Sequence, residues 1–146
     1  MKIFVIPNEI LLPDVEKILR NGMNVTLRVK GNSMLPFIHG DNDSAVLVPA
    51  NCIQKGDVVL AHLKNNCYIM HRIIRLKGDN VTLMGDGNLQ ETECCHVSDI
   101  CGKVTLILRN NKSIDLTSLT ERCKAVIWQK LRPIRRYMLA IYRRIN

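Results

Sequence analysis

The sequence predicts a mainly β protein: a folded-over β body with a helix before it and a basic helix after it. Short runs of alternating apolar and polar residues, separated by turns that contain Asn and Gly, fill the middle of the chain. The flanking segments instead repeat apolar residues every three or four positions, which is helix spacing. Aromatic residues make up only 4% of the 146 residues, so aliphatic side chains must fill the core.

The first predicted element is a helix over residues 8–21. Asn8 can cap its start and Gly22 can end it, whereas Pro13 favours a later start of the regular part. The apolar stretch of residues 1–13 is broken by polar residues and has no small-residue cleavage site, so we expect no signal peptide. The apolar residues that define the helix face are Ile10, Leu11, Val15, Ile18 and Leu19.

The middle of the chain has the pattern of short strands. Asn-Asn or Gly-Asp-Asn turns separate several of them. Short strands joined by such turns favour a β body that folds over on itself. The predicted strands are 24–30, 44–49, 57–64, 67–76, 80–84, 103–108 and 112–116.

A basic helical tail is predicted over residues 118–146. Residues 118–121, Ser-Leu-Thr-Glu, form a capping-box pattern, and Pro133 ends or kinks the helix that follows. The eight basic residues from Arg122 onward are accompanied by no Asp or Glu, so the tail carries the whole net charge of +8. No linker or repeat separates the tail from the core at about 24–116, and we expect one domain.

The apolar residues of the tail form a helical stripe, and two interpretations of it remain open. The stripe packs on the β body, or the tail lies on an anionic membrane surface with Trp128, Tyr137 and Tyr142 at the interface. No apolar run is long enough for a transmembrane helix, and no binding fold indicates nucleic acid. We expect a cytoplasmic protein, peripheral at the inner face of the membrane under the second interpretation. The stripe consists of Trp128, Leu131, Ile134, Met138, Ile141 and Ile145.

Six cysteines without a secretory signal indicate reduced thiols in a cytoplasmic setting. Cys94, Cys95, His96 and Cys101 lie close together in the sequence, but they contain no C-x-x-C pair. Adjacent cysteines rarely ligate one tetrahedral ion together. We therefore expect no bound metal and no cofactor.

Residues 29–36, Val-Lys-Gly-Asn-Ser-Met-Leu-Pro, are the most informative run of the chain. Ser33 follows a predicted strand and lies between Gly31 and Pro36, which favour a tight turn that exposes the serine. A serine nucleophile needs a positioned base. Three further runs follow in the chain: Gly-Asp-Val-Val-Leu at 56–60, His-Arg-Ile-Ile at 71–74 and Gly-Asp-Gly-Asn at 85–88.

The order G-x-S-M-x-P, GD-V-V, H-R-I and GD-x-N resembles the serine peptidases that group signal peptidases with LexA-type self-cleaving repressors. The resemblance covers roughly residues 25–105 and implies a LexA/signal-peptidase-like β body. Most of this clan uses a lysine base, whereas the archaeal and endoplasmic-reticulum type of signal peptidase uses a histidine within H-R, which His71-Arg72 matches. Gly31 is LexA-like, and Pro36 is a signal-peptidase feature.

The resemblance implies peptide-bond hydrolysis by a serine endopeptidase of the signal-peptidase type. Ser33 is then the nucleophile and His71 the base. Asp86 is expected to orient His71, and Glu91 or Glu93 is the alternative acidic partner. A lysine base, with Lys64 and Lys77 flanking the base strand, is a further alternative, although neither falls where the family places its lysine.

The expected substrate is an extended leader or signal-like peptide that adds beside the strand at 25–30. The resemblance implies small residues just before the cut. Gly31, Asn32 and Met34 are the candidate substrate-binding residues. One alternative is a LexA-like self-cleaving regulatory module, although we expect no helix-turn-helix DNA-binding domain before residue 25. The other alternative is a non-catalytic peptide-binding or membrane-associated module of the same fold.

Overall fold

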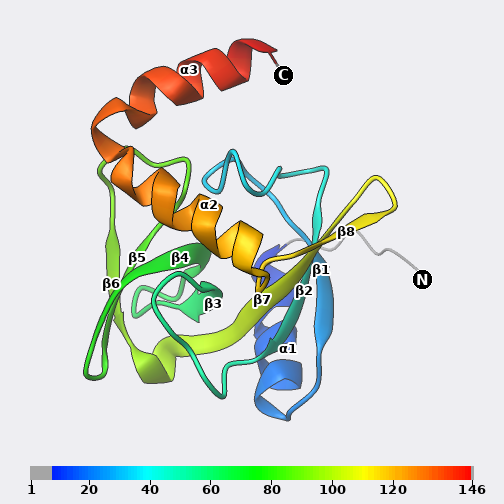
Figure 1. The fold of residues 1–146 in the computed structure, drawn as a ribbon. Coiled ribbons are helices and arrows are strands. Elements are labelled where there is room, and N and C mark those ends of the chain that lie inside the picture. The colour runs from blue at the N-terminus through cyan, green and yellow to red at the C-terminus, as the bar shows by residue number, and fades with distance from the viewer. Residues whose placement is uncertain (1–7, 146) are drawn as a thin grey trace.

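Eight antiparallel strands form one sheet in the structure, a computed structural model that describes residues 8–145 (Figure 1). The sheet curls into a half-barrel with the order β1-β2-β7-β3-β4-β5-β6, and β8 pairs with β7. The predicted fold class is confirmed. The strands are β1 Val25–Arg28, β2 Ser44–Pro49, β3 Val58–His62, β4 Tyr68–Lys77, β5 Asn80–Met84, β6 Glu93–His96, β7 Ile100–Arg109 and β8 Lys112–Asp115.

All seven predicted strands are present, with bounds that differ by three residues or fewer. Strand β6 was not predicted. Its sequence, Glu-Cys-Cys-His, lacks the alternation of strongly apolar and polar residues that marks a half-buried strand. It lies at the edge of the sheet and takes its register from β5, where Leu83 pairs with Glu93 and Asn80 with His96.

The core lies on both faces of β3, which is why this strand is a nearly continuous apolar run. Val58 and Leu60 join one buried cluster, and Val59 and Ala61 join another. Both clusters contain only aliphatic and sulfur-containing buried side chains, in agreement with the low aromatic content. Because close packing on both faces holds β3 in place, it also fixes the positions of the strands that pair with it, β4 and β7.

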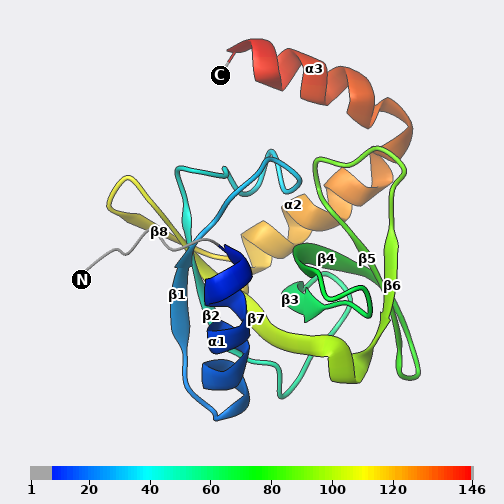
Figure 2. The ribbon, with the colours of Figure 1, turned by 180° about the vertical axis from the view of Figure 1, so that it is seen from behind.

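Helices cover opposite sides of the folded sheet (Figures 1 and 2). Helix α1, Asn8–Arg20, packs Val15 and Leu19 into the core and contacts β1, β2 and β7. It begins at Asn8 with Pro13 inside it, so the later start that the proline favoured is wrong. The part of the signal-peptide expectation that concerns residues 1–7 lies outside the described residues.

The predicted basic tail is two helices rather than one. Helix α2, Leu119–Lys130, begins where the Ser118 hydroxyl accepts a hydrogen bond from the Glu121 N–H at 3.3 Å. Pro133 lies in a single 3-10 turn, η2 (Arg132–Ile134), and helix α3, Arg135–Ile145, then continues in a different direction (Figure 1). Within residues 8–145 no helix has the length and apolar character that crossing a membrane requires.

A buried carboxylate, Asp43, fixes the segment between β1 and β2. It accepts hydrogen bonds from the His39 N–H at 2.7 Å and from Arg109 of β7 at 2.7 and 2.8 Å. Arg109 also donates to the carbonyl of Phe37 at 2.9 Å. Burial alone raises the pKa of Asp43, but these hydrogen bonds and the charge of Arg109 outweigh it and lower the pKa below its ordinary value.

We predict that Asp43→Asn lowers the free energy of unfolding by about 3 kcal/mol at neutral pH, because it leaves Arg109 without its charge partner. A lowered folded-state pKa means that the carboxylate stabilises the fold fully above the unfolded-state pKa of about 3.9, and that this contribution is lost as the pH falls through the folded-state value. Urea unfolding should therefore show a difference between wild type and variant that shrinks below about pH 4. Asp41→Asn, at an exposed neighbour, is the control. A difference that stays constant in acid would contradict the prediction.

Candidate active site

Ser33 lies in the turn-rich segment that connects β1 to β2. Gly31 has a φ of +82°, a conformation that favours glycine, and it turns the chain two residues before the serine. The turn continues with hydrogen bonds from the Leu35 N–H to the Asn32 carbonyl at 3.3 Å and from the Phe37 N–H to the Met34 carbonyl at 3.0 Å. These short-range bonds hold the serine at a defined position outside the strands.

His71 lies in the first half of β4, where it pairs with Val59 of the buried strand β3. The residue is 8% exposed, and its Nε2 lies 3.1 Å from the Ser33 hydroxyl oxygen. The structure thus brings together the two residues that the sequence motifs proposed as nucleophile and base. The distance is within hydrogen-bond reach.

The acidic partner of His71 is Glu93, which accepts a hydrogen bond from Nδ1 of the imidazole. Glu93 is the first residue of β6, the edge strand that the sequence did not predict, and it is half-buried. Glu91, the other glutamate considered, is exposed. The expectation that Asp86 orients His71 is therefore wrong in the structure, where Glu93 bonds the imidazole instead.

Asp86 instead forms a buried ion pair with Arg72. Arg72 donates from Nε at 2.8 Å and from Nη2 at 2.7 Å to the two carboxylate oxygens, which is a bidentate contact. The physical reason is strand geometry: His71 and Arg72 are consecutive in β4 and point to opposite faces. The carboxylate of Asp86 lies on the Arg72 face.

The 85–88 turn that carries Asp86 also supports the backbone of the nucleophile. The Gly87 N–H donates to the Ser33 carbonyl at 2.8 Å, and the Asp86 N–H donates to the sulfur of Met34 at 3.4 Å. A Cβ at Gly85 would lie 2.4 Å from the Ser33 carbonyl oxygen, so only glycine permits this approach. Asp86 thus pairs with Arg72 and lies in the turn that supports the Ser33 backbone, and it does not contact the His71 imidazole.

Helix α2 also contacts the 85–88 turn and the segment that carries Ser33, through Trp128. The indole N–H of Trp128 donates to the Asp86 carbonyl at 2.7 Å, and its ring meets Phe37 edge to face at 6.3 Å between centroids. The guanidinium of Arg72 lies over the Phe37 ring at 5.0 Å. Helix α2 thus contacts the segment that carries Ser33 through Phe37, and it contacts the 85–88 turn through the Asp86 carbonyl.

The backbone N–H of Ser33 donates no hydrogen bond to any other described residue. Such a free N–H beside the hydroxyl is the donor that an oxyanion of an attacked carbonyl requires. Gly31 provides no side chain there, so the backbone is the donor that this segment offers.

A cleft of about 170 Å³ opens beside Ser33 and His71. Gly31 and Met34, two of the three candidate substrate-binding residues, line it, whereas the third, Asn32, is exposed and is not among the lining residues. A second small cavity of about 100 Å³ continues along the same strands. The residues lining the first cleft are Val29, Lys30, Gly31, Ser33, Met34, Tyr68, Ile69, Met70 and His71.

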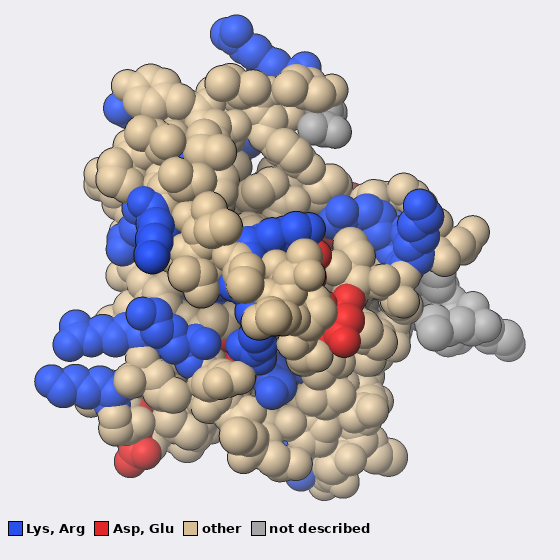
Figure 3. Space-filling model, in the orientation of Figure 1, with Lys and Arg blue, Asp and Glu red and all other residues tan. Residues whose placement is uncertain are grey.

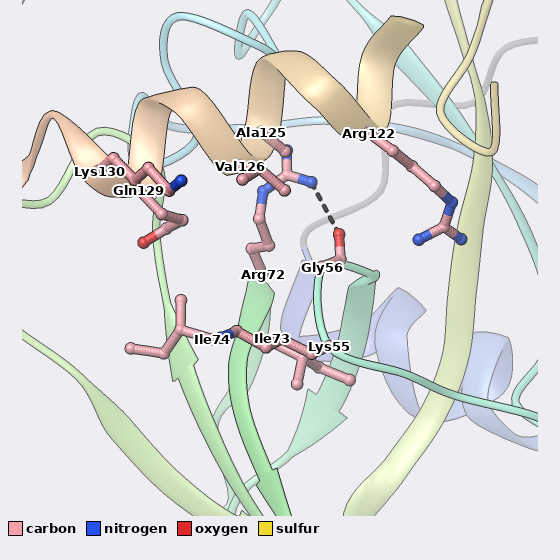
Figure 4. A pocket seen from close by; sticks show the side chains of 10 residues that line it. All are labelled: Lys55, Gly56, Arg72, Ile73, Ile74, Arg122, Ala125, Val126, Gln129 and Lys130. Atoms are coloured by element: carbon pink, nitrogen blue, oxygen red, sulfur yellow. Dashed lines mark hydrogen bonds between the residues drawn. The ribbon is translucent and has the colours of Figure 1, made fainter. Parts of the chain in front are cut away.

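A separate cavity of about 470 Å³ lies between α2 and the sheet, on the Arg72 side of β4 (Figure 4). Figure 4 shows Arg72 rising from β4 toward α2 and donating to the Gly56 carbonyl, at 2.8 Å. Apolar side chains such as Ile74 and Val126 form part of the wall, and Lys55 also lines the cavity. Ser33 and His71 do not line this cavity.

Of the cysteine and histidine residues that are close in the sequence, Cys94, Cys95 and His96 lie in β6, and Cys101 is buried in β7. Cys94 and His96 are exposed, and Cys95 is half-buried. Burial, with the nearby Asp99 and Cys94, raises the pKa of Cys95 to about 11, and burial raises the pKa of Cys101 to about 12. Both thiols are therefore protonated at neutral pH and poor nucleophiles.

A comparison of the sequence with known protein families matches residues 6–105 to the family described as Peptidase S24-like. The match spans α1 and the sheet as far as β7, and it includes Ser33, His71 and Glu93. Helices α2 and α3 lie beyond it. A search of curated proteins finds no match to the chain.

We predict that Asp86→Asn lowers the free energy of unfolding by about 4 kcal/mol, because it leaves the buried Arg72 without a counter-charge. Chemical denaturation measures this loss. Asp79→Asn, at an exposed aspartate in the turn between β4 and β5, is the matched control and should change stability by less than about 0.5 kcal/mol. Equal stability of wild type and the Asp86 variant would contradict the structural role of the pair.

Proposed function

The chain belongs to the Peptidase S24-like family, and we propose that it is a serine endopeptidase of the signal-peptidase type with a histidine base. In this proposal it hydrolyses a peptide bond in an extended leader or signal-like peptide. One observation carries the proposal: the Ser33 hydroxyl lies 3.1 Å from Nε2 of His71, while Nδ1 of the same ring bonds Glu93. Nucleophile, base and orienting carboxylate in this order are the parts of a catalytic triad.

The hydrogen bonds specify how the three groups would act. With Nδ1–H donating to Glu93, the neutral imidazole has its free lone pair on Nε2, where it accepts the Ser33 proton. As Oγ attacks the scissile carbonyl, His71 becomes an imidazolium that the Glu93 carboxylate stabilises. The Ser33 N–H binds the oxyanion that forms on attack, and His71 gives its proton to the amine as the C–N bond breaks. A water molecule, which gives up a proton to His71, then attacks the acyl group on Ser33, releases the carboxylic acid product and restores the serine hydroxyl.

The cleft suits an extended peptide. Strand β1 is an edge of the sheet, and residues 68–71 of β4 pair with β3 on one side while β5 begins its pairing only at Arg72. The cleft is lined by Val29 and Lys30 on one wall and by residues 68–71 on the other. A peptide strand between them would find backbone hydrogen-bond partners on both sides. The cleft volume of about 170 Å³ favours small side chains near the cut.

We predict that Glu93→Gln lowers kcat by at least about 100-fold with little change in KM, because the amide no longer stabilises the imidazolium. Steady-state kinetics on an extended peptide measures both constants. Glu93→Asp should restore part of kcat, and Glu91→Gln, at the exposed neighbouring glutamate, should leave it unchanged. A Glu93→Gln enzyme with wild-type kcat would remove Glu93 from the proposed triad.

We predict that Ser33→Ala and His71→Ala each lower hydrolysis of an extended-peptide library by at least about 1000-fold. Lys64, in the turn between β3 and β4, and Lys77, the last residue of β4, are both exposed. Lys64→Ala and Lys77→Ala should each change the rate less than about threefold. Mass spectrometry of the library identifies the cut site.

The same experiment separates the alternatives. Cleavage of added peptide by wild type and not by Ser33→Ala establishes a peptidase acting in trans. Cleavage of the chain itself, with the library left intact, would instead favour a self-cleaving module. Binding of peptide with equal strength and no cleavage by either protein would identify a peptide-binding module.

A further inference from the structure

The surface of η2 and α3 exposes an unusual number of large apolar side chains. They recur at three- and four-residue spacing and therefore lie on one face of the helix. Figure 3 shows a mostly uncharged surface over the α3 segment at the top of the view, with basic side chains at its edges. The exposed fractions are 48% for Ile134, 61% for Tyr137, 37% for Met138, 59% for Ile141 and 76% for Ile145. We call this set the apolar face of α3.

A different face of α3 attaches the helix to the body. Arg135 is fully buried and donates to the carbonyls of Asn88 and Trp128 at 3.0 and 3.2 Å. Leu139 is 3% exposed, and Tyr142 shares a 2.6 Å hydrogen bond with Nε2 of His39. Packing on the β body therefore accounts for this inner face and for the buried Trp128 of α2, but among residues 8–145 it leaves the apolar face of α3 exposed.

The charge around the apolar face has one sign. Lys130, Arg132, Arg136, Arg143 and Arg144 are exposed, and none of them pairs with a carboxylate among the described residues. The sequence after Glu121 contains no acidic residue. An amphipathic helix with an apolar face and a strongly basic polar face is the form that lies in the surface plane of an anionic bilayer.

We propose that α3 docks this protein on the surface of a membrane that contains anionic lipid. The apolar face of α3 enters the boundary between headgroups and acyl chains, and the surrounding arginines contact the lipid phosphates. Charge complementarity selects the bilayer as the occupant, because a second copy of the chain would bring the same basic side chains against one another.

The attachment of α3 has a consequence for the candidate active site. His39, which Tyr142 contacts, lies six residues after Ser33 in the same connecting segment. A docked α3 therefore holds the nucleophile segment near the bilayer surface. Docking itself does not depend on hydrolysis, and Ser33→Ala should bind vesicles as the wild type does.

Vesicle flotation of the full chain tests the proposal, with phosphatidylcholine vesicles that either contain or lack phosphatidylglycerol. Point variants are preferable to truncation, since deletion of α3 also removes the buried Arg135 and Leu139. The wild type should bind only the vesicles with phosphatidylglycerol, and added salt should weaken this binding steeply.

Two double variants and their matched controls separate the two contributions. Ile141→Ser with Ile145→Ser should weaken binding at least about tenfold, whereas Met23→Ser with Leu119→Ser, at sites 56% and 78% exposed, should change it less than about twofold. The double variant Arg143→Gln with Arg144→Gln should weaken binding roughly 20-fold at low salt. Its control, Arg75→Gln with Lys77→Gln at exposed positions of β4, removes the same charge away from α3 and should have a smaller effect. All four proteins should keep the wild-type melting temperature, because the substituted side chains are exposed.

Equal binding to both kinds of vesicle, or no binding to either, would overturn the proposal. So would equal effects of the α3 variants and their controls. A concentration-dependent dimer that the Ile141 and Ile145 substitutions dissociate, without vesicle binding, would identify a second copy as the occupant instead.

Discussion

The buried ion pair between Arg72 and Asp86 is the interaction on which the arrangement of the site depends. It joins β4 to the turn that supports the Ser33 backbone, and it is satisfied by a bidentate contact that offsets the cost of burying both charges. Phe37 covers the guanidinium, and Trp128 bonds the Asp86 carbonyl. Nucleophile segment, sheet and tail helix therefore meet at one charged centre, and a shift of that centre would be transmitted to all three.

The alternation of side chains along β4 places the structural ion pair of Arg72 and the proposed catalytic pair of His71 on opposite faces of the strand. His71 faces the cleft and Arg72 faces the opposite side, so two adjacent residues select two different carboxylates. Asp86 neutralises a buried cation that never approaches the cleft, whereas Glu93 can respond to the charge of the imidazole. One strand thus carries a structural ion pair and a proposed catalytic pair within two residues, without competition between their acidic partners.

The fold was largely predictable from the sequence because apolar periodicity reports burial directly. The order of motifs also pointed to Ser33 and His71, whose side chains the structure brings within hydrogen-bond reach. The acidic partner of His71 could not be predicted in this way. The Gly-Asp-Gly-Asn run at 85–88 indicates a turn, but it does not indicate which face of β4 the Asp86 carboxylate contacts. Glu93 depends on an edge strand whose four residues carry little apolar signal. The apolar spacing of the tail predicts a single stripe, whereas the structure breaks it at Pro133: Trp128 is buried, and the stripe residues from Ile134 onward are exposed.

Trp128 lies in the last quarter of the chain, yet it bonds the turn that holds Ser33 in place. During synthesis, the segments around Ser33, His71 and Glu93 leave the ribosome well before this indole does. The nascent chain therefore contains all three proposed catalytic groups before it contains the part that braces them. A chain released before Trp128 would therefore lack the indole hydrogen bond to the Asp86 carbonyl and the ring contact to Phe37.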